Sequence, residues 1–399
     1  MLKDTYCGRL SLADSNREVV LGGWVKSLRN LGGLIFITLR DSSGLVQISC
    51  DPSKVSLATE LGLEDVIWVK GTVLERPKEA RNPKMATGDV EVKAQELKLL
   101  NKSKVPPFAV EDQVKASEEL RLKYRYLDLR RPAAAKNIKL RHEATQVVRE
   151  YLNGLGFFEI STPFLARSTP EGARDYLVPA RNWPGRFYAL PQSPQLYKQL
   201  LMVAGFEKYY QLACCLRDED LRADRQPEFY QIDIEMSFIV EEDILQLTEG
   251  LMRRVFKKVL SVDFAEPFPR MDYAECIERY GIDKPDLRFG LPIKDLGPIL
   301  KSTSFAPFVN GEAIRGIVVK NGESISRSEI EKFPELFWTK KRGSLSGGIA
   351  KYITPDMVQA LGLEDGDLLL VKAGNKDEIL KKLGEVRLFL GERLGLRKE

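Results

Sequence analysis

Five short runs of strand-forming residues, all between residues 18 and 100, constrain the fold of this chain more than any other feature. Gly, Asp and Ser residues separate the runs, as expected for turns between strands. Five short strands in about a hundred residues favour a small closed β-barrel. The predicted strands span residues 18–25, 34–40, 45–49, 66–74 and 90–100.

The second run alternates, and the alternation makes Phe36 a candidate exposed ring. Leu34, Phe36, Thr38 and Arg40 fall on one face, and Ile35, Ile37 and Leu39 on the other. An aromatic ring beside Lys26, Arg29 and Arg40 suits stacking on single-stranded bases while cations hold phosphates. A core phenylalanine beside solvated charges fits the same pattern, so the residues alone leave both interpretations open.

Length and charge limit the architecture. A chain of 399 residues exceeds what one hydrophobic core usually organises, and we expect two to four domains. With 43% hydrophobic and 30% charged residues, it is expected to fold as a soluble globular protein. The net charge of +4 means that a nucleic acid must be bound by a local basic face rather than by bulk charge.

Several classes of site and location are disfavoured. The chain has one histidine, His142, and no Cys-x-x-Cys pair, so the usual zinc site and the histidine-dependent hydrolases lack their residues. Five scattered cysteines predict no disulfide framework. No apolar stretch is long enough to span a membrane, and the first residues do not resemble a signal peptide, so we expect a cytoplasmic protein.

Beyond the barrel, the sequence predicts a linker and further folded regions. Residues 101–117, with Pro106 and Pro107, read as the linker. Apolar positions from Ala144 to Leu155 predict an amphipathic helix, and residues 157–160 a strand that ends before Pro163. Past residue 287, strands over 313–320 and 366–371 and a helix over 376–394 predict an α+β module, with a turn at 344–348.

Polar residues that could form a binding or catalytic site are concentrated between residues 169 and 238. Ser193 is a candidate N-cap with Pro194 as the first helical residue, which places Gln195, Lys198 and Gln199 on one helix face. In the run that ends near Glu219, Arg217 and Glu219 share a side.

The run from 229 to 238 alternates cleanly. Gln231, Asp233, Glu235 and Ser237 form one face, and Tyr230, Ile232, Ile234, Met236 and Phe238 form the other. A solvated polar face is one interpretation. The other is a site, because cations, amides and carboxylates that include Glu171 suit a small zwitterionic ligand together with a phosphate.

Three segments carry a resemblance to a known family. They are Thr169-Pro-Glu-Gly-Ala-Arg-Asp-Tyr, Ala189-Leu-Pro-Gln-Ser-Pro-Gln-Leu-Tyr-Lys, and Arg217-Asp-Glu-Asp-Leu-Arg-Ala-Asp-Arg-Gln-Pro-Glu-Phe. Together they closely resemble the bacterial aspartyl-tRNA synthetases, which are class II enzymes. The resemblance implies a multidomain α+β fold: an OB-type anticodon-binding barrel (1–105), a hinge (106–120), the first half of the antiparallel-sheet catalytic domain (121–286) and a bacterial-type (GAD-type) insertion domain (287–399).

The resemblance also implies roles for individual residues. L-Aspartate would be bound by Glu171, Gln195, Lys198, Arg217, Gln231 and Asp233, and ATP with Mg²⁺ by Arg217, Asp218, Glu219 and Gln226. Arg217 would be the catalytic residue, and Lys198 would face the aspartate side chain. Arg29, Phe36 and Gln47 would bind the anticodon of tRNA(Asp), and Pro163 would lie in a homodimer interface. With leucine at position 31, the chain resembles the family members that charge tRNA(Asp) alone. Relatives that also charge tRNA(Asn) tend to carry histidine at this position.

The sequence departs from the family pattern at its C-terminal end. The third class II motif, with its arginine for the ATP γ-phosphate, is not found before Glu399. We therefore expect an amino-terminal part of a ligase that is inactive by itself. The alternatives are a truncated paralogue that binds RNA or a partner, and a related class II ligase for asparagine or lysine.

Overall fold

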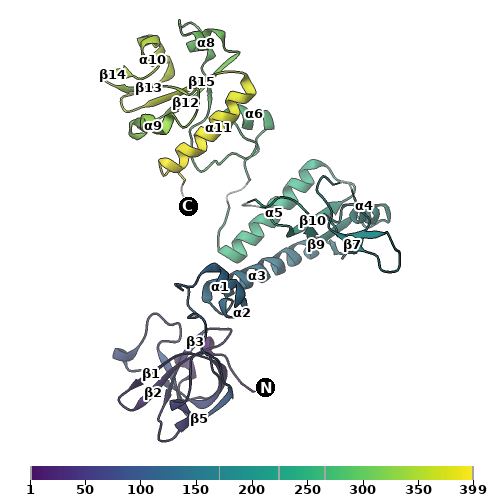
Figure 1. Ribbon diagram of the computed structural model, residues 1–399, viewed down its shortest axis with the longest axis vertical. Helices are drawn as coiled ribbons and strands as arrows, with labels where there is room; N and C mark the ends of the chain where they lie inside the picture. The colour runs from purple at the N-terminus through teal and green to yellow at the C-terminus, as the bar shows by residue number, and fades with distance from the viewer. Residues whose placement is uncertain (1, 170, 223–224, 265–266, 398–399) are drawn as a thin grey trace. The chain divides into compact units, whose positions relative to one another are not determined.

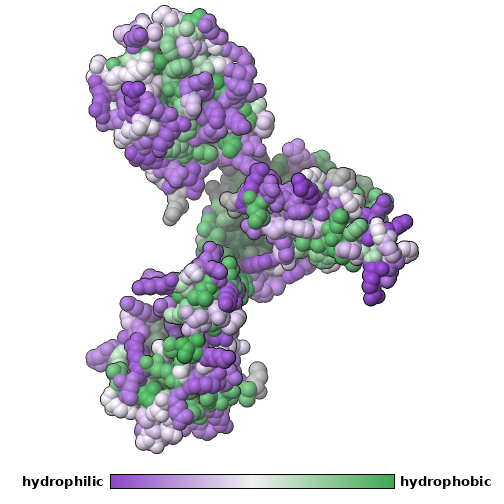
Figure 2. All heavy atoms as spheres, viewed as in Figure 1, coloured by the Kyte–Doolittle hydropathy of each residue, from purple (hydrophilic) through white to green (hydrophobic). Residues whose placement is uncertain are grey.

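The computed structural model describes residues 2–169, 171–222, 225–264 and 267–397, in two compact units, Met1–Phe264 and Ala265–Glu399 (Figure 1). In the space-filling view, hydrophilic residues cover much of the visible face of the second unit (Figure 2). None of the helices described is long and apolar enough to cross a membrane.

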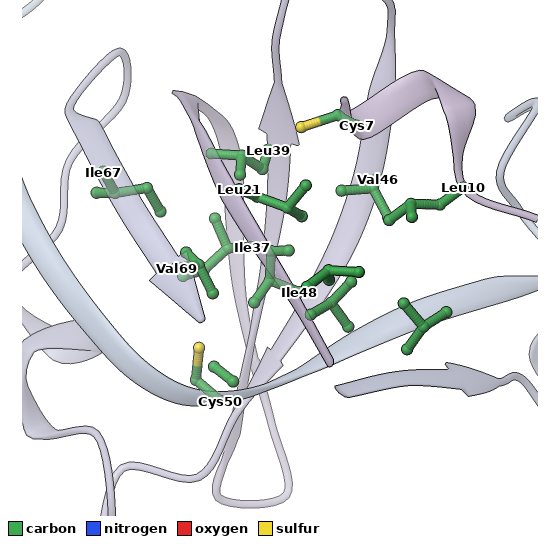
Figure 3. Close-up of a cluster of buried hydrophobic side chains, with 14 of the residues drawn as sticks. Cys7, Leu10, Leu21, Ile37, Leu39, Val46, Ile48, Cys50, Ile67 and Val69 are labelled. Carbon is green, nitrogen blue, oxygen red and sulfur yellow. The ribbon is translucent and has the colours of Figure 1, made fainter. Parts of the chain in front are cut away.

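The first unit begins with a closed barrel, which confirms the five predicted strands. Their order around the barrel is β1-β2-β3-β5-β4. Residues on alternate positions fill the barrel, among them Leu21, Ile37 and Ile48, each fully buried (Figure 3). The strands are β1 (Glu18–Leu31), β2 (Leu34–Arg40), β3 (Leu45–Cys50), β4 (Val66–Glu75) and β5 (Val90–Asn101).

Strand β1 continues six residues beyond its predicted end. Gly32 and Gly33 both have positive φ, +61° and +89°, which a two-residue hairpin turn requires and glycine adopts without strain. The turn lets β1 and β2 pair as far as Leu31 and Leu34. The hairpin therefore extends the outer face on which Phe36 lies.

The predicted alternation of β2 is confirmed except at Arg40. Ile35, Ile37 and Leu39 are buried, while Phe36 is partly exposed. Arg40 is buried and donates to Glu64 at 2.6 Å. Because this guanidinium is held by a carboxylate of the protein itself, the prediction that Arg40 offers a cation to RNA phosphates is wrong.

Residues 102–117 form neither helix nor strand, and helices α1 (Glu118–Lys123), α2 (Arg125–Asp128) and α3 (Pro132–Gly154) come next. Helix α3 begins twelve residues before the predicted start at Ala144. Its buried residues, Val147, Val148 and Leu152, all lie in the second half. The first three turns have no buried stripe, which is why the periodicity did not reveal them.

A small sheet carries the polar residues of the central region. Its order is β10-β9-β6, with β10 (Glu228–Met236) antiparallel to β9 (Lys208–Leu216), and β6 (Phe158–Glu159) parallel to β9. Helices α3 and α5 (Glu241–Leu260) pack against one face through a core that contains Leu152, Tyr210 and Leu251. Ile234 packs against this core, whereas Ile232 is 44% exposed.

Helix α4 (Gln195–Val203) packs against β9 and β10. It begins at Gln195, so Pro194 takes the cap position and not, as predicted, the first helical one. The predicted shared face is also only partly correct, because Lys198 is buried while Gln199 is exposed. A separate hairpin, β7 (Leu177–Pro179) and β8 (Phe187–Ala189), precedes α4 (Figure 1).

The second unit is an α+β module on a sheet of order β11-β12-β15-β13-β14. The strands predicted over 313–320 and 366–371 and the helix over 376–394 are confirmed. The turn predicted at 344–348 is only partly correct. Residues 344–346 form strand β14, which pairs with β13 around Gly343 (φ +64°), and the bend and turn follow at Gly347 and Gly348. Helix α6 packs against α11, so the unit includes residues before 287. Its elements are α6 (Tyr273–Tyr280), β11 (Lys294–Asp295), α7 (Gly297–Leu300), α8 (Ala306–Asn310), β12 (Ala313–Val319), α9 (Arg327–Ile330), β13 (Phe337–Arg342), β14 (Ser344–Ser346), α10 (Pro355–Leu361), β15 (Leu368–Gly374) and α11 (Lys376–Arg393).

Candidate functional site

The register of β9 and β10 assembles one polar face of the sheet. Asp233 lies opposite Gln211, Glu235 opposite Tyr209, and Phe229 opposite Cys215. Directly opposed residues of an antiparallel pair project to the same side. The predicted polar face of residues 231–237 is therefore confirmed, and β9 extends it.

Lys198 reaches this face from α4. Its Nζ lies 2.8 Å from Asp233 Oδ1 and 3.4 Å from Glu235 Oε2. Lys198 is 8% exposed and Asp233 is 9% exposed, so this part of the face is covered rather than solvated. Asp233 and Glu235 both pair with Lys198. A buried lysine is stable only when such a partner is present.

One carboxylate oxygen of Asp233 accepts no hydrogen bond from the described residues. Oδ2 is buried and has no hydrogen-bond partner among the residues that the structure describes. The neighbouring Tyr209 hydroxyl donates to Gln211 Oε1 at 2.9 Å, and Thr162 donates to the same oxygen at 3.1 Å. Burial raises the pKa of Tyr209, and nearby Asp233 raises it further. A buried carboxylate oxygen without a donor suits a ligand that brings one, such as an ammonium group.

The segment from Glu171 to Asp175 is fastened beside α4. Ser193 Oγ donates to Glu171 Oε2 at 2.6 Å and accepts from the backbone of Gln195. Gln192, only 1% exposed, binds both backbone groups of Ala173 and also donates to Asp175. Gln192 thus fixes the segment that carries Glu171.

Arg217 comes directly after the last residue of β9. Its guanidinium carbon lies 5.0 Å from the centre of the Phe229 ring, and its Nε donates to the Gln192 carbonyl at 3.4 Å. The ring and the carbonyl together orient a guanidinium whose other N–H groups make no hydrogen bond to the described residues. Further along, Glu219 accepts from Arg225 at 3.0 Å, and Asp218 donates its backbone N–H to the carbonyl of Arg174.

Cys215 lies on the same face of the sheet, directly opposite Phe229. Burial raises the pKa of its thiol to about 11, and the positive charge of Arg217 opposes the rise. Its Sγ also lies 3.3 Å from Gln231 Oε1. Contacts link these residues in turn: Gln231 with Cys215, Arg217 with Gln192, Glu171 with Ser193, and Lys198 with Asp233. Gln226 is exposed and makes no hydrogen bond or ion pair with the described residues.

The second candidate surface lies on the outside of the barrel. Phe36 pairs in register with Arg29 on β1 and with Ser49 on β3, and Gln47 lies opposite Thr38. These residues share the outer face, and Gln47 Nε2 donates to Glu91 at 2.8 Å. Phe36, Arg29 and Gln47 are thus neighbours on one surface.

Pro163 is exposed, and the residues after it are exposed and apolar: Phe164 at 51% and Leu165 at 53%. Sequence reasoning missed Gln192, Asp175 and Phe229 as parts of the site. Their partners lie elsewhere in the chain or are backbone groups, so no spacing pattern marks them. Glu235 was placed on the polar face, but its contact with Lys198 was not foreseen.

Two family models match this chain. One, described as tRNA synthetases class II (D, K and N), matches residues 117–375, and the other, described as an OB-fold nucleic acid binding domain, matches residues 19–100. The chain is 52% identical over 408 residues to an aspartate–tRNA(Asp/Asn) ligase of Oleidesulfovibrio alaskensis, covering 98% of this chain and 67% of that protein. It is 48% identical over 419 residues to an aspartate–tRNA ligase of Geobacillus kaustophilus, covering 99% and 71%.

Solved structures share the fold. Asparaginyl-tRNA synthetase from Pyrococcus horikoshii, complexed with asparaginyl-adenylate, superposes with a TM-score of 0.61 at 20% identity, covering 98% of this chain and 96% of that one. At that identity the likeness concerns the fold alone. The matches to the family models and to close relatives go further: the chain belongs to the class II aminoacyl-tRNA synthetases, in the aspartate–tRNA ligase family.

Proposed function

We propose that this protein activates L-aspartate with ATP and transfers it to the 3′ end of tRNA(Asp). The observation that carries the proposal is the buried Lys198, held by Asp233 and Glu235 on a face that also presents Arg217. This arrangement offers a cation to a carboxylate side chain and, separately, a guanidinium to phosphate. Membership of the aspartate–tRNA ligase family supports it.

Lys198 selects the substrate side chain. An aspartate carboxylate is a charged acceptor for an N–H of Lys198 Nζ, whose protein-side neighbours are Asp233 and Glu235. An asparagine amide offers only a neutral oxygen or an N–H donor, so it is a weaker partner for the cation. Specificity thus depends on electrostatics and not on size, because the two side chains are nearly isosteric.

The α-ammonium group of the substrate finds acceptors on the opposite side of the same cluster. Asp233 Oδ2 lacks a donor, and Glu171 and the amide oxygens of Gln195 and Gln231 provide further acceptors. Glu171 is itself oriented by Ser193. These groups fix the amino acid so that its α-carboxylate points toward Arg217.

Adenylate formation needs no protein nucleophile. The α-carboxylate oxygen attacks the α-phosphorus of ATP, a new P–O bond forms, and the bond to the bridging oxygen breaks as pyrophosphate leaves. Arg217 neutralises the charge that develops on the phosphoryl oxygens and is the catalytic residue of this proposal. Mg²⁺ enters with ATP as part of the substrate. Asp218, Glu219 and Gln226 lie on the segment after β9 and contact the nucleotide.

The barrel supplies the tRNA contact. Phe36 stacks on an unpaired anticodon base, and Arg29 and Gln47 hold phosphate or base edges beside it. Among the relatives, some carry the name aspartate–tRNA ligase and others aspartate–tRNA(Asp/Asn) ligase. Leu31, 61% exposed at the hairpin tip, supports recognition of tRNA(Asp) alone. A homodimer formed through Pro163 and a cytoplasmic location complete the proposal.

The test is aspartate-dependent exchange between pyrophosphate and ATP, measured on Lys198→Leu and on the unchanged sequence. Each is carried in a ligase of the relatives' full length, because this chain spans 67% of one relative and 71% of the other. We expect the substitution to abolish exchange at millimolar aspartate while the protein remains folded by circular dichroism. Lys257→Leu is the matched control, because Lys257 forms an exposed pair with Asp263 and should exchange normally. Equal exchange by Lys198→Leu and the unchanged protein would refute the role of Lys198.

A further inference from the structure

The hairpin formed by β7 and β8 belongs to no part of the site described so far. Its strands pair Leu177 with Ala189 and Pro179 with Phe187. At the tip, Trp183 donates its backbone N–H to Ala180, and Arg186 donates to Trp183, both at 3.0 Å. Gly185, with φ +76°, completes the tight turn. The tip is therefore ordered by its own backbone hydrogen bonds.

The side chains at this tip are exposed to solvent. Trp183 is 62% exposed and Phe187 is 57% exposed. All residues from 181 to 188 are exposed. Arg181 and Arg186 flank the tryptophan, and no ion pair is formed by either among the described residues. A single exposed ring is common on protein surfaces, but this tip carries three within six residues, because Tyr188 is also 39% exposed, and grouped exposed rings mark a candidate binding surface.

The charge around the hairpin has one sign. From residue 176 to residue 206 the sequence contains no aspartate or glutamate, but it contains Arg181, Arg186 and Lys198. Lys198 is buried and paired with Asp233, so the exposed charge is that of the two arginines. A surface with rings and arginines but no carboxylates is complementary to RNA, whose bases stack on rings and whose phosphates pair with guanidinium groups.

Both ends of the hairpin are fastened to the candidate site. Leu190 donates to the carbonyl of Tyr176 at 2.9 Å, next to the contact of Gln192 with Asp175. The strand that leaves the hairpin leads directly to Ser193, which holds Glu171. The tip is about four strand residues, roughly 13 Å, away from Tyr176. The base of the hairpin is therefore joined to the segment that carries Glu171.

We propose that the β7–β8 hairpin binds the single-stranded 3′ end of the tRNA, with Trp183 stacking on one of its unpaired bases and Arg181 and Arg186 holding the adjacent phosphates. The proposal rests on the proposed function, because it assumes that tRNA is the second substrate. It adds a contact near the adenylate that is separate from the anticodon contact on the barrel.

The experiment measures the affinity of purified protein for two RNAs by fluorescence anisotropy at about 0.1 M salt. One RNA is intact tRNA(Asp), and the other is the same tRNA without its single-stranded 3′ nucleotides. We expect Trp183→Ala to bind intact tRNA at least about fivefold more weakly than the unchanged protein, in line with the loss of one base stack. For the shortened tRNA the two proteins should bind equally.

Three further variants sharpen the result. Trp183→Phe keeps a ring and should recover most of the affinity. Arg181→Gln with Arg186→Gln should lower the slope of log affinity against log salt by about 1 to 2. Tyr273→Ala removes a ring that is 72% exposed in the second unit and should leave both affinities unchanged.

Equal affinity of Trp183→Ala and the unchanged protein for intact tRNA would overturn the proposal, and so would an equal loss on the shortened tRNA. If Trp183→Ala instead shifts the protein to a smaller species in sedimentation velocity without changing tRNA affinity, the hairpin contacts a second copy of the chain and the proposal is wrong. If the unchanged protein does not bind tRNA at all, the proposed function fails together with this inference.

Discussion

Lys198 and Asp233 form a buried ion pair between α4 and β10, with Nζ and Oδ1 2.8 Å apart and about nine-tenths of each side chain covered. The pair fixes the helix on the polar face of the sheet. It also leaves Asp233 Oδ2 free for a donor that the described residues do not supply. The same ion pair thus holds α4 on the sheet and leaves a carboxylate oxygen for a ligand.

Removing the cation should destabilise the first unit. In Lys198→Met, Asp233 and Glu235 remain covered without a counter-charge, and we expect a loss on the order of 3 kcal/mol in the free energy of unfolding. Lys257→Met, which breaks an exposed pair, should cost less than about 1 kcal/mol. Urea denaturation followed by circular dichroism measures both. A smaller loss for Lys198→Met than for Lys257→Met would show that the buried pair is not stabilising.

Gln192→Ala should weaken aspartate binding. The substitution removes the contacts with Ala173 and Asp175, so the segment that carries Glu171 loses its attachment. We expect the KM for aspartate in pyrophosphate exchange to rise about tenfold, while the KM for ATP changes little. Gln199→Ala, an exposed substitution on the same helix as Lys198, is the control. An unchanged KM for aspartate in Gln192→Ala would contradict this positioning role.

Phe36→Ala should separate tRNA binding from amino acid activation. Loss of one stacked base predicts about a tenfold weaker affinity for tRNA(Asp), with pyrophosphate exchange unaffected because the ring lies on the barrel. Tyr6→Ala removes another partly exposed ring of the same unit and should leave the affinity unchanged. Should the affinity stay the same in Phe36→Ala as well, the outer face of β2 is not the anticodon contact.

Asp128, the last residue of α2, should make the stability of the first unit depend on pH. A hydrogen bond from Arg131 holds the pKa of this fully covered carboxyl below its usual 3.8, and the charges of Arg125 and Arg121 act in the same direction. Because the folded-state pKa is the lower one, the stabilisation is present above pH 3.8 and is lost as the pH falls through the folded-state value. Asp128→Asn should therefore be less stable than the unchanged protein at pH 7 and converge with it near pH 3 in thermal melts. A difference that is constant with pH would contradict the charge-based explanation.

The buried Arg387 side chain should be required for the stability of the second unit. The side chain is fully buried and donates to three carbonyls, those of Asp286, Phe289 and Gly290, while its guanidinium lies on the rings of Tyr280 and Phe289. Burial lowers its pKa. Arg387→Lys cannot reproduce the planar contact with two rings, so it should destabilise the unit more than Arg327→Lys, an exposed change. Differential scanning calorimetry of both variants tests this.

The sequence specified the barrel strands and the alternating faces of β10, because a period of two is read directly from the residues. It placed Asp233 and Glu235 on one side of β10, as the structure has them, and made Phe36 a candidate exposed ring. It did not reveal that Arg40 turns inward, since its partner Glu64 is 24 residues away. The contact between Lys198 and Asp233, 35 residues apart, was likewise beyond a local pattern.

The family resemblance supplied what the residue pattern could not. A polar strand face is compatible with simple solvation, and only the resemblance assigned Lys198 to a substrate carboxylate. The burial of that face then argues against solvation. Gln192 was missed by both approaches, because its role is to bind backbone groups of a segment that the fold brings beside it.

The most direct test of the central claim compares amino acids in ATP–pyrophosphate exchange, with this sequence carried in a ligase of the relatives' full length. If Lys198 faces the substrate side chain, aspartate should support exchange and asparagine should be at least about a hundredfold poorer in kcat/KM, because a neutral amide is a weaker partner for the cation than a carboxylate. Exchange with asparagine or lysine that equals or exceeds the exchange with aspartate would contradict the account.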